Sequence, residues 1–328
     1  MINLNNYKIV FFGTSEFGAT ILTRLCQVVK PILVITTPDE KFGRHQILTP
    51  SPVKIFSLEQ QINVLQPEKL DDKFYKLLDS RWSLPRTTIQ GGNDKSCVDL
   101  FVVAAYGKII PQNILDMPQF GSLNIHPSLL PQYRGASPIQ TALLNGNNQT
   151  GVTIILMDAK IDHGPIVAQT PIIKILETEK FPELRDRLAE ISADLLIKTL
   201  PDWFNKKITP QPQNDQTATF CCLIKKEAGQ INWQNTASKI FNHWRAYYPW
   251  PGIYSSEFGG LKNPNLIKLI EIKTNSLTSN LKPGTLFTFD KKLFVTCGQK
   301  TTLEIISLQP AGKNPMTASS FINGYPQT

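Results

Sequence analysis

The sequence lacks several patterns that would assign a chain to a common class of protein. No apolar run approaches the roughly 20 residues that a membrane-spanning helix needs, and no basic stretch followed by an apolar signal segment opens the chain. The five cysteines are scattered and odd in number, with neither a C-x-x-C pair nor the paired histidines of a zinc site. These absences predict a cytoplasmic protein with reduced cysteines and no bound metal.

The first glycine-containing turn lacks a nucleotide-binding signature. An apolar run at Tyr7–Phe12 leads into Gly13–Gly18, which contains neither G-x-G-x-x-G nor Gly-Lys-Ser/Thr. Apolar residues then recur at helical spacing over 16–29, and a second apolar run follows at 31–35. The order strand, turn, helix, strand predicts a βαβ unit with a parallel, right-handed crossover, without a nicotinamide cofactor or a bound triphosphate.

Positive charge is present in excess, but only in one part of the chain. Residues 1–205 hold 20 basic and 20 acidic residues, whereas residues 206–328 hold 14 basic and 6 acidic ones. A length of 328 residues also exceeds one ordinary core. Two domains are expected, and the basic one indicates an anionic macromolecular partner, with nucleic acid favoured over membrane. Solvated surface lysines without a partner are the alternative.

The remaining pattern predicts an α/β fold. We expect a mostly parallel sheet domain over 1–204, a proline-containing linker over 205–216, and a small C-terminal β-barrel of OB-like type over 217–328. The long stretch 36–54 is expected to be a loop, and the polar stretch 79–97 has no assignment. Further strands are expected at 62–65, 98–105, 151–157, 166–175, 253–254, 266–272, 285–289, 293–296 and 303–308, and helices at 68–78, 138–144, 183–200 and 237–247.

The segment Gly121–Gln140 has the character of a site. Leu123 and Ile125 alternate with Asn124 and His126, so a half-buried strand would turn both polar side chains to one face. Pro127 then ends the strand at the edge where open α/β sheets hold ligands. Asp162 follows in a loop between two later strands, where a carboxylate can orient an imidazole and favour its charged form. A structural histidine and a turn-forming aspartate are the alternatives.

Three segments can be compared with known families: Asn124-Ile125-His126-Pro127-Ser128-Leu129-Leu130-Pro131, then Tyr133-Arg134-Gly135, and a D-x-x-x-D-x-G loop around Asp162. Together they resemble the folate-dependent formyltransferases. The resemblance implies a Rossmann-like catalytic domain and formyl transfer from 10-formyltetrahydrofolate. It implies catalytic roles for Asn124, His126 and Asp162, in a reaction that uses no metal. It also implies a folate site formed by Ser128, Leu129, Leu130 and Pro131.

Several outer segments narrow the resemblance to the branch of this family that acts on initiator methionyl-tRNA. They are Gly43–Lys54, Lys225–Trp233, Tyr248–Gly252 and Leu308–Met316. The branch implies a monomer in which Lys41, Arg44, Lys54, Lys206 and Lys207 hold the RNA. Two features depart from the family pattern. The 41–54 loop has one glycine where a second is usual, and residues 81–96 form an insertion without a recognisable counterpart.

Two other interpretations stay open at the level of sequence. A folate-dependent N-formyltransferase acting on an amino sugar nucleotide or on glycinamide ribonucleotide would share the central motif, but it would not need the basic barrel. A noncatalytic RNA-binding protein with a degenerate formyltransferase domain would need the barrel but not the three polar residues. The presence of Asn124, His126 and Asp162 together argues against the second alternative.

Overall fold

The computed structural model describes residues 3–43, 46–82, 98–259 and 266–324. Arg44 and residues 83–96 of the predicted insertion lie outside this description. By its contacts the chain divides into two compact units. The first unit comprises Met1–Pro138, Gln149–Lys174 and Arg185–Cys222; the second comprises Ile139–Asn148, Ile175–Leu184 and Leu223–Thr328.

This division differs from a single break near the predicted linker. Helix α5 (Pro138–Leu144) and the start of α6 (Phe181–Phe204) group with the second unit. The reason is visible at Arg245 of α7 (Ala237–Tyr247), which is buried and donates from Nη1 to the carbonyl of Leu176 at 3.0 Å. Residues 205–222, by contrast, remain with the first unit.

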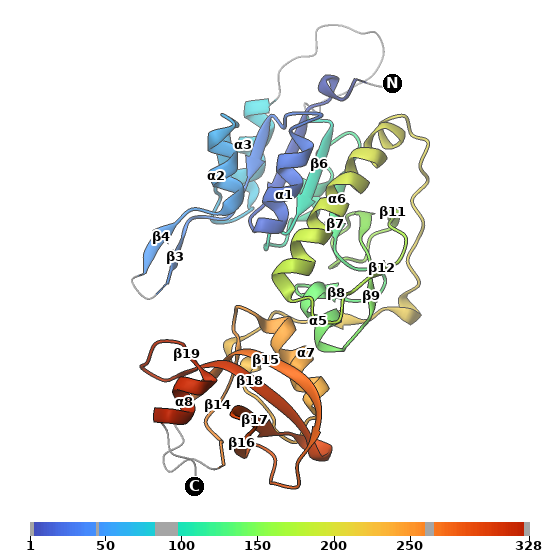
Figure 1. The fold of residues 1–328 in the computed structure, drawn as a ribbon. Helices are drawn as coiled ribbons and strands as arrows, with labels where there is room; N and C mark the ends of the chain where they lie inside the picture. The colour runs from blue at the N-terminus through green and yellow to red at the C-terminus, as the bar shows by residue number, and fades with distance from the viewer. Residues whose placement is uncertain (1–2, 44–45, 83–97, 260–265, 325–328) are drawn as a thin grey trace, which may run out of the picture. The chain divides into compact units, whose positions relative to one another are not determined.

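A seven-stranded sheet forms the centre of the first unit (Figure 1). The five strands from β7 to β5 are parallel, and β10 and β11 add antiparallel pairs at one edge, which confirms the predicted α/β class. The apolar runs give buried strands because both faces of a parallel sheet are covered. In spatial order the strands are β11 (Ile166–Gln169), β10 (Thr153–Leu156), β7 (Ser122–His126), β6 (Leu100–Ala104), β1 (Ile9–Gly13), β2 (Leu33–Ile35) and β5 (Val64–Leu65).

Helices cover both faces of this sheet. On one face Val10 and Phe12 of β1 pack with Phe74 of α3 (Asp72–Trp82) and Ile114 of α4 (Gln112–Leu115). The other face carries α1 (Glu16–Leu25) and α6, which lie side by side in Figure 1 and are joined by a hydrogen-bonded ion pair between Arg24 and Asp194. Within the described residues, no helix has both the length and the apolar composition required to cross a bilayer.

The stretch 36–54 is not the loop that we expected. It forms a hairpin of β3 (Glu40–Phe42) and β4 (Ile47–Thr49), which projects from the unit in Figure 1, and then enters α2 (Pro52–Glu59). Pro52 stands at the first position of α2, where its missing amide costs nothing. The two strands have three residues each, and Lys41, Ile47 and Leu48 are all exposed, so polar and apolar residues do not alternate between a buried and a solvent face as a sequence pattern would require.

The predicted strand over 166–175 is in fact two strands. Pro171 lacks the amide hydrogen that a sheet ladder requires, and the chain leaves the main sheet there. After it, β12 (Ile173–Lys174) pairs with β9 (Gln149–Thr150). A further small pair, β8 (Arg134–Gly135) with β13 (Phe220–Cys221), joins segments 86 positions apart. Short 3₁₀ turns lie at Leu4–Asn6, Asp215–Thr217, Lys226–Gly229 and Gly298–Lys300.

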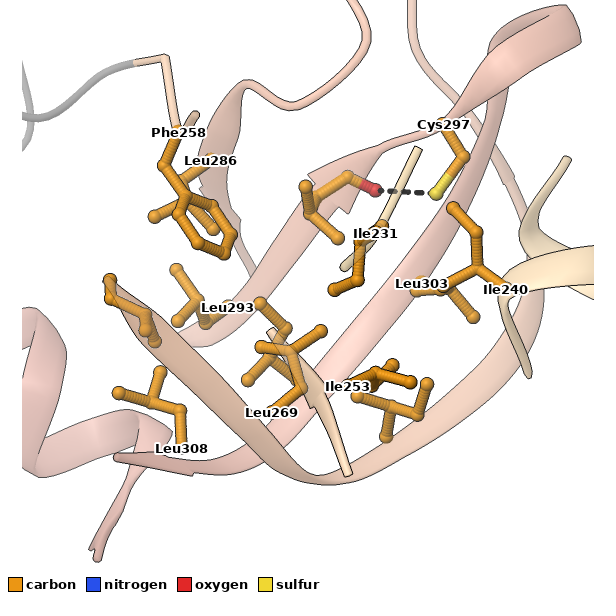
Figure 2. Close-up of a cluster of buried hydrophobic side chains, with 14 of the residues drawn as sticks. Ile231, Ile240, Ile253, Phe258, Leu269, Leu286, Leu293, Cys297, Leu303 and Leu308 are labelled. Atoms are coloured by element: carbon orange, nitrogen blue, oxygen red, sulfur yellow. Dashed lines mark hydrogen bonds between the residues drawn. The ribbon is translucent and has the colours of Figure 1, made fainter. Parts of the chain in front are cut away.

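The second unit is built on a six-stranded antiparallel sheet. A bridge between Gly259 and Thr285 links the segment after β14 to the start of β16, so the two edges of the sheet meet. Aliphatic side chains from every long strand and from α7 fill the interior (Figure 2). Its elements are β14 (Ile253–Ser255), β15 (Ile267–Thr278), β16 (Leu286–Phe289), β17 (Lys292–Thr296), β18 (Thr301–Pro310), β19 (Met316–Thr317) and α8 (Ala318–Gly324).

The environments of the cysteines predict very different reactivity. Burial raises the pKa of the Cys297 thiol to about 12 and that of Cys26 to about 11. At pH 8 roughly one thiol in a thousand or fewer is then the reactive thiolate at either position. Cys222 is exposed. We therefore expect iodoacetamide to alkylate Cys222 before Cys26 and Cys297 in the native protein, as read by mass spectrometry of peptides. Alkylation of Cys297 at the rate of Cys222 would contradict this.

Candidate active site

Strand β7 presents two polar side chains at the carboxyl end of the parallel sheet. Asn124 and His126 are two residues apart, so both point to the same face, while Leu123 and Ile125 are buried on the other. The pairing of β7 with β6 on one side and β10 on the other fixes this register. The His126 side chain is only 5% exposed, so its ring is held firmly against the sheet.

Asp162 reaches the same face by an unexpected route. Because β10 runs antiparallel to β7, Leu156 at its end lies opposite Leu123, near the start of β7. The loop that follows must therefore fold back over the sheet. Gly164 makes this possible, since a Cβ there would lie 1.9 Å from the carbonyl oxygen of Leu156. Asp162 itself has a φ of 47°, a left-handed conformation that costs a non-glycine residue roughly 1–2 kcal/mol.

The three side chains predicted to act together do converge. Asn124 donates from Nδ2 to Oδ1 of Asp162 at 3.1 Å, and Nδ1 of His126 lies 3.5 Å from Oδ2 of Asp162. The amide of Gly135 donates to the same Oδ2 at 2.8 Å. The Asp162 side chain is 13% exposed, so its charge lies in a largely water-excluded place. A buried carboxylate requires such donors.

The histidine contacts determine which ring nitrogen can exchange a proton. Nε2 of His126 lies 2.8 Å from the carbonyl oxygen of Tyr133. A carbonyl oxygen only accepts, so Nε2 must carry a hydrogen. Nδ1 is therefore the nitrogen that gains or loses a proton, and it faces the Asp162 carboxylate. Both nitrogens act as donors only in the imidazolium form.

The four residues predicted to hold folate have two different roles in the local structure. Ser128 and Leu130 are buried, and their polar groups are used within the turn: Oγ of Ser128 donates to Gln132 O at 2.6 Å, and the Leu130 amide donates to Oγ1 of Thr153. Leu129 and Pro131 are half-buried. Leu129 and Pro131 are thus the apolar residues of the four that keep exposed surface, while Ser128 and Leu130 fix the shape of the turn.

Sequence reasoning missed a second layer of polar residues behind Asp162. Arg134 is 4% exposed. It donates to Oε1 of Gln213 and to Oδ1 of Asp215, and the Arg134 contact lowers the pKa of the Asp215 carboxyl, with His163 adding to the effect. Gln213 and Asp215 lie in the segment predicted as a linker. No local pattern marks them; only the folded chain brings them beside the Asp162 loop.

Comparison with known proteins identifies the family. The Formyl transferase model matches residues 7–200, and the model of the Formyl transferase C-terminal domain matches residues 223–326. The chain belongs to the formyltransferase family. Relatives named methionyl-tRNA formyltransferase include those of Halalkalibacterium halodurans, 37% identical over 97% of this chain and 94% of that protein. The relative of Listeria innocua is 38% identical over 97% of this chain and 95% of that protein.

Solved structures of an N-formyltransferase and of HypX share the fold. An N-formyltransferase from Helicobacter canadensis, solved with folinic acid and dTDP-3-aminofucose, matches with a TM-score of 0.63 at 18% identity over 91% of this chain and 98% of that one. HypX from Aquifex aeolicus, solved with tetrahydrofolic acid, matches with a TM-score of 0.60 at 14% identity over 96% of this chain and 46% of that one. The predicted membership of the formyltransferases is confirmed.

The lysines predicted on the β3–β4 hairpin differ in their surroundings. Lys41 is exposed. Lys54 is not: its Nζ pairs with Asp39 at 2.7 Å, and the hydrogen bonds of Lys54 and Gln66 lower the pKa of the Asp39 carboxyl. Lys54 thus fastens the base of the hairpin. Arg44 lies outside the described residues.

Lys206 and Lys207 lie far from the triad within the same unit. They follow α6, whose last turn packs at the amino ends of the strands: Trp203 donates to Phe120 O just before β7, and Phe204 stacks on Tyr7 just before β1. His126 is at the opposite end of β7. The structure therefore does not bring Lys206 and Lys207 to the catalytic edge of the sheet, and Lys207 pairs with Asp202 at 3.6 Å.

Proposed function

We propose that this formyltransferase moves the formyl group of 10-formyltetrahydrofolate to the α-amino group of methionine on initiator methionyl-tRNA. The observation that carries the proposal is the Asn124–Asp162–His126 constellation in a chain that is 37% identical, over nearly its full length, to a methionyl-tRNA formyltransferase. All three side chains come from one unit of one chain, so the proposal needs no second copy. We also propose that the reaction takes place in the cytoplasm.

The chemistry follows from the positions of the donors. The amine nitrogen attacks the formyl carbon, the carbonyl oxygen becomes an oxyanion, and the bond to N10 of the folate then breaks as N10 takes up a proton. Nδ2 of Asn124 carries two hydrogens, of which Asp162 accepts one. The other can serve the oxyanion. The His126 imidazolium, held by the carbonyl of Tyr133, adds a positive charge beside it.

Asp162 has two roles in this scheme. Its carboxylate lies 3.5 Å from Nδ1 of His126 and orients the ring. It also stands where the proton of the attacking amine must leave, directly or through a water molecule. Leu129 and Pro131 supply apolar contact for the folate beside the triad, and the buried Ser128 and Leu130 hold that turn in shape.

Two exposed surfaces are assigned to the RNA. One is the β3–β4 hairpin, which carries Lys41 and the exposed apolar side chains of Ile47 and Leu48. The other is the second unit, whose exposed lysines contact phosphates without reading the sequence. These lysines are Lys225, Lys226, Lys239, Lys273, Lys282, Lys291, Lys300 and Lys313. Lys292 is exposed too, but it pairs with Glu304 at 3.2 Å and is not counted. We leave Lys54, Lys206 and Lys207 out of this surface on the grounds of their pairing and position.

A formylation assay with three acceptors tests the proposal. Given 10-formyltetrahydrofolate, the protein should formylate initiator methionyl-tRNA with a far higher kcat/KM than an amino sugar nucleotide or glycinamide ribonucleotide. Affinity for the tRNA should fall by at least about tenfold between 50 and 200 mM salt, because phosphate contacts release counterions. A higher kcat/KM on either small amine would refute the assignment of the acceptor.

A further inference from the structure

Gln213 connects the segment after α6 to the loop that carries Asp162. Its Nε2 donates to the backbone carbonyl of Asp162 at 2.9 Å and to that of Gly164 at 2.8 Å. Its Oε1 accepts two hydrogen bonds from Arg134, at 3.0 Å from Nε and 2.8 Å from Nη2. One half-buried amide thus makes four hydrogen bonds on two separate segments.

The polarity of these contacts leaves one possible orientation for the amide. Arginine only donates and backbone carbonyls only accept, so Oε1 must face Arg134 and Nε2 must face the loop. No other side chain of similar length offers an acceptor and two donors in this arrangement. A carboxylate would satisfy Arg134 but would turn an oxygen toward the two carbonyls. The site therefore specifies glutamine rather than a generic polar residue.

The hydrogen bonds from Gln213 are made to the part of the Asp162 loop whose backbone conformation is the least favourable. Asp162 has a left-handed backbone with a φ of 47°, and Gly164 lies in a turn too tight for a Cβ. These two residues are also the two whose carbonyls Gln213 holds. Arg134 anchors the other side of the amide, and the next residue, Gly135, donates its N–H to the Asp162 carboxylate at 2.8 Å.

We propose that Gln213 is a positioning residue for formyl transfer: it holds the Asp162 backbone so that the carboxylate faces Asn124, His126 and the Gly135 amide. This inference rests on the proposed function for its kinetic readout. Losing the two loop bonds lets the carboxylate move away from His126. A displacement of about 1 Å in a catalytic group can cost about 100-fold in rate.

Gln213→Glu and Gln213→Met test the positioning role, because each variant removes a different set of the Gln213 hydrogen bonds. The glutamate keeps the acceptor for Arg134 and removes only the two donors to the loop, so the variant retains the partner of the buried arginine. The methionine removes all four bonds at nearly constant length. Gln211→Glu is the matched control, since Gln211 is exposed on the same segment and its Nε2 bonds only to Thr209 O at 3.0 Å.

We expect Gln213→Glu to lower kcat by about 100-fold while KM for folate and tRNA stays unchanged, because the lost interaction acts on the transition state and not on binding. Gln211→Glu should match the wild type. The chain has four histidines, so NMR can follow the ring signals of His126, which should shift in Gln213→Glu and stay fixed in Gln211→Glu. A merely structural role would lower stability without moving these signals selectively.

The two readouts separate failure of this inference from failure of the proposed function. If the wild type formylates none of the three acceptors, the proposed function is wrong, and the His126 signals alone then decide the role of Gln213. If the wild type is active and Gln213→Glu keeps kcat within twofold with unchanged His126 signals, the positioning role is overturned. In that case we also expect Gln213→Met to be active.

Discussion

Replacing His126 with alanine is expected to slow formyl transfer by about 10²- to 10³-fold, the usual cost of removing one preorganised group that stabilises a developing oxyanion. The substitution removes the positive charge next to Asp162 and leaves the carbonyl of Tyr133 without its ring partner. Binding of tRNA should stay nearly intact, because the hairpin and the lysines of the second unit are unchanged. Single-turnover formylation and a filter-binding assay measure the two effects.

His243→Ala provides the control for this experiment. The ring of His243 also bonds through Nε2 to a backbone carbonyl, that of Ala228 at 2.7 Å, and burial lowers its pKa. It therefore resembles His126 in its anchoring but belongs to the second unit, whereas the triad belongs to the first. Its loss should leave kcat close to that of the wild type. Unchanged turnover in His126→Ala would remove the catalytic assignment of the imidazole.

Asp162→Asn separates charge from shape at the same site. The carboxylate accepts from Asn124 on Oδ1 and from the Gly135 amide on Oδ2, while it also faces His126. An amide of the same size has one acceptor oxygen, so one of these contacts must become a donor–donor clash. This reasoning explains why a carboxylate, and not merely a polar group, is needed at position 162.

Much of the fold was predictable because strong apolar periodicity leaves little choice. The runs that became β1 and β6 are buried on both faces, β7 keeps the predicted alternation, and α7 begins and ends where its pattern indicated. The convergence of Asp162 with His126 was also predicted, from the position of the Asp162 loop between two later strands and from the family motif. The route was not: the loop returns over the face of the sheet because β10 is antiparallel.

The remainder of the site depends on pairings that leave no trace in a local window. The strand β13 has two residues and owes its existence to β8, 86 positions earlier. Gln213 and Asp215 lie among prolines and polar residues that read as a linker, yet they complete the shell of Asp162. Charge had the same limit. It marked Lys54 and Lys206 as cations. Only the fold shows that Lys54 pairs with Asp39 and that Lys206 lies at the edge of the sheet opposite the triad.

Gly135→Ala is expected to cost both activity and stability, because this residue is where β8, β13 and the Asp162 loop meet. Gly135 has a φ of 119°, and a Cβ there would lie 2.1 Å from the carbonyl oxygen of Cys221. The obstacle is backbone and cannot rotate away. We expect the free energy of unfolding to fall by about 2–5 kcal/mol, the sum of a left-handed penalty and an overpacking penalty.

The same substitution should slow formyl transfer by about 100-fold in the fraction that folds, since moving the Gly135 amide by 1 Å moves its bond to Asp162. Gly107→Ala is the control: it lies in the same unit with a φ of 85°, and nothing stands within 4 Å of its Cβ position. It should lose only the left-handed penalty of about 1–2 kcal/mol. Equal losses of stability in the two variants, by urea titration, would show that the contact between Gly135 and Cys221 does not constrain the site.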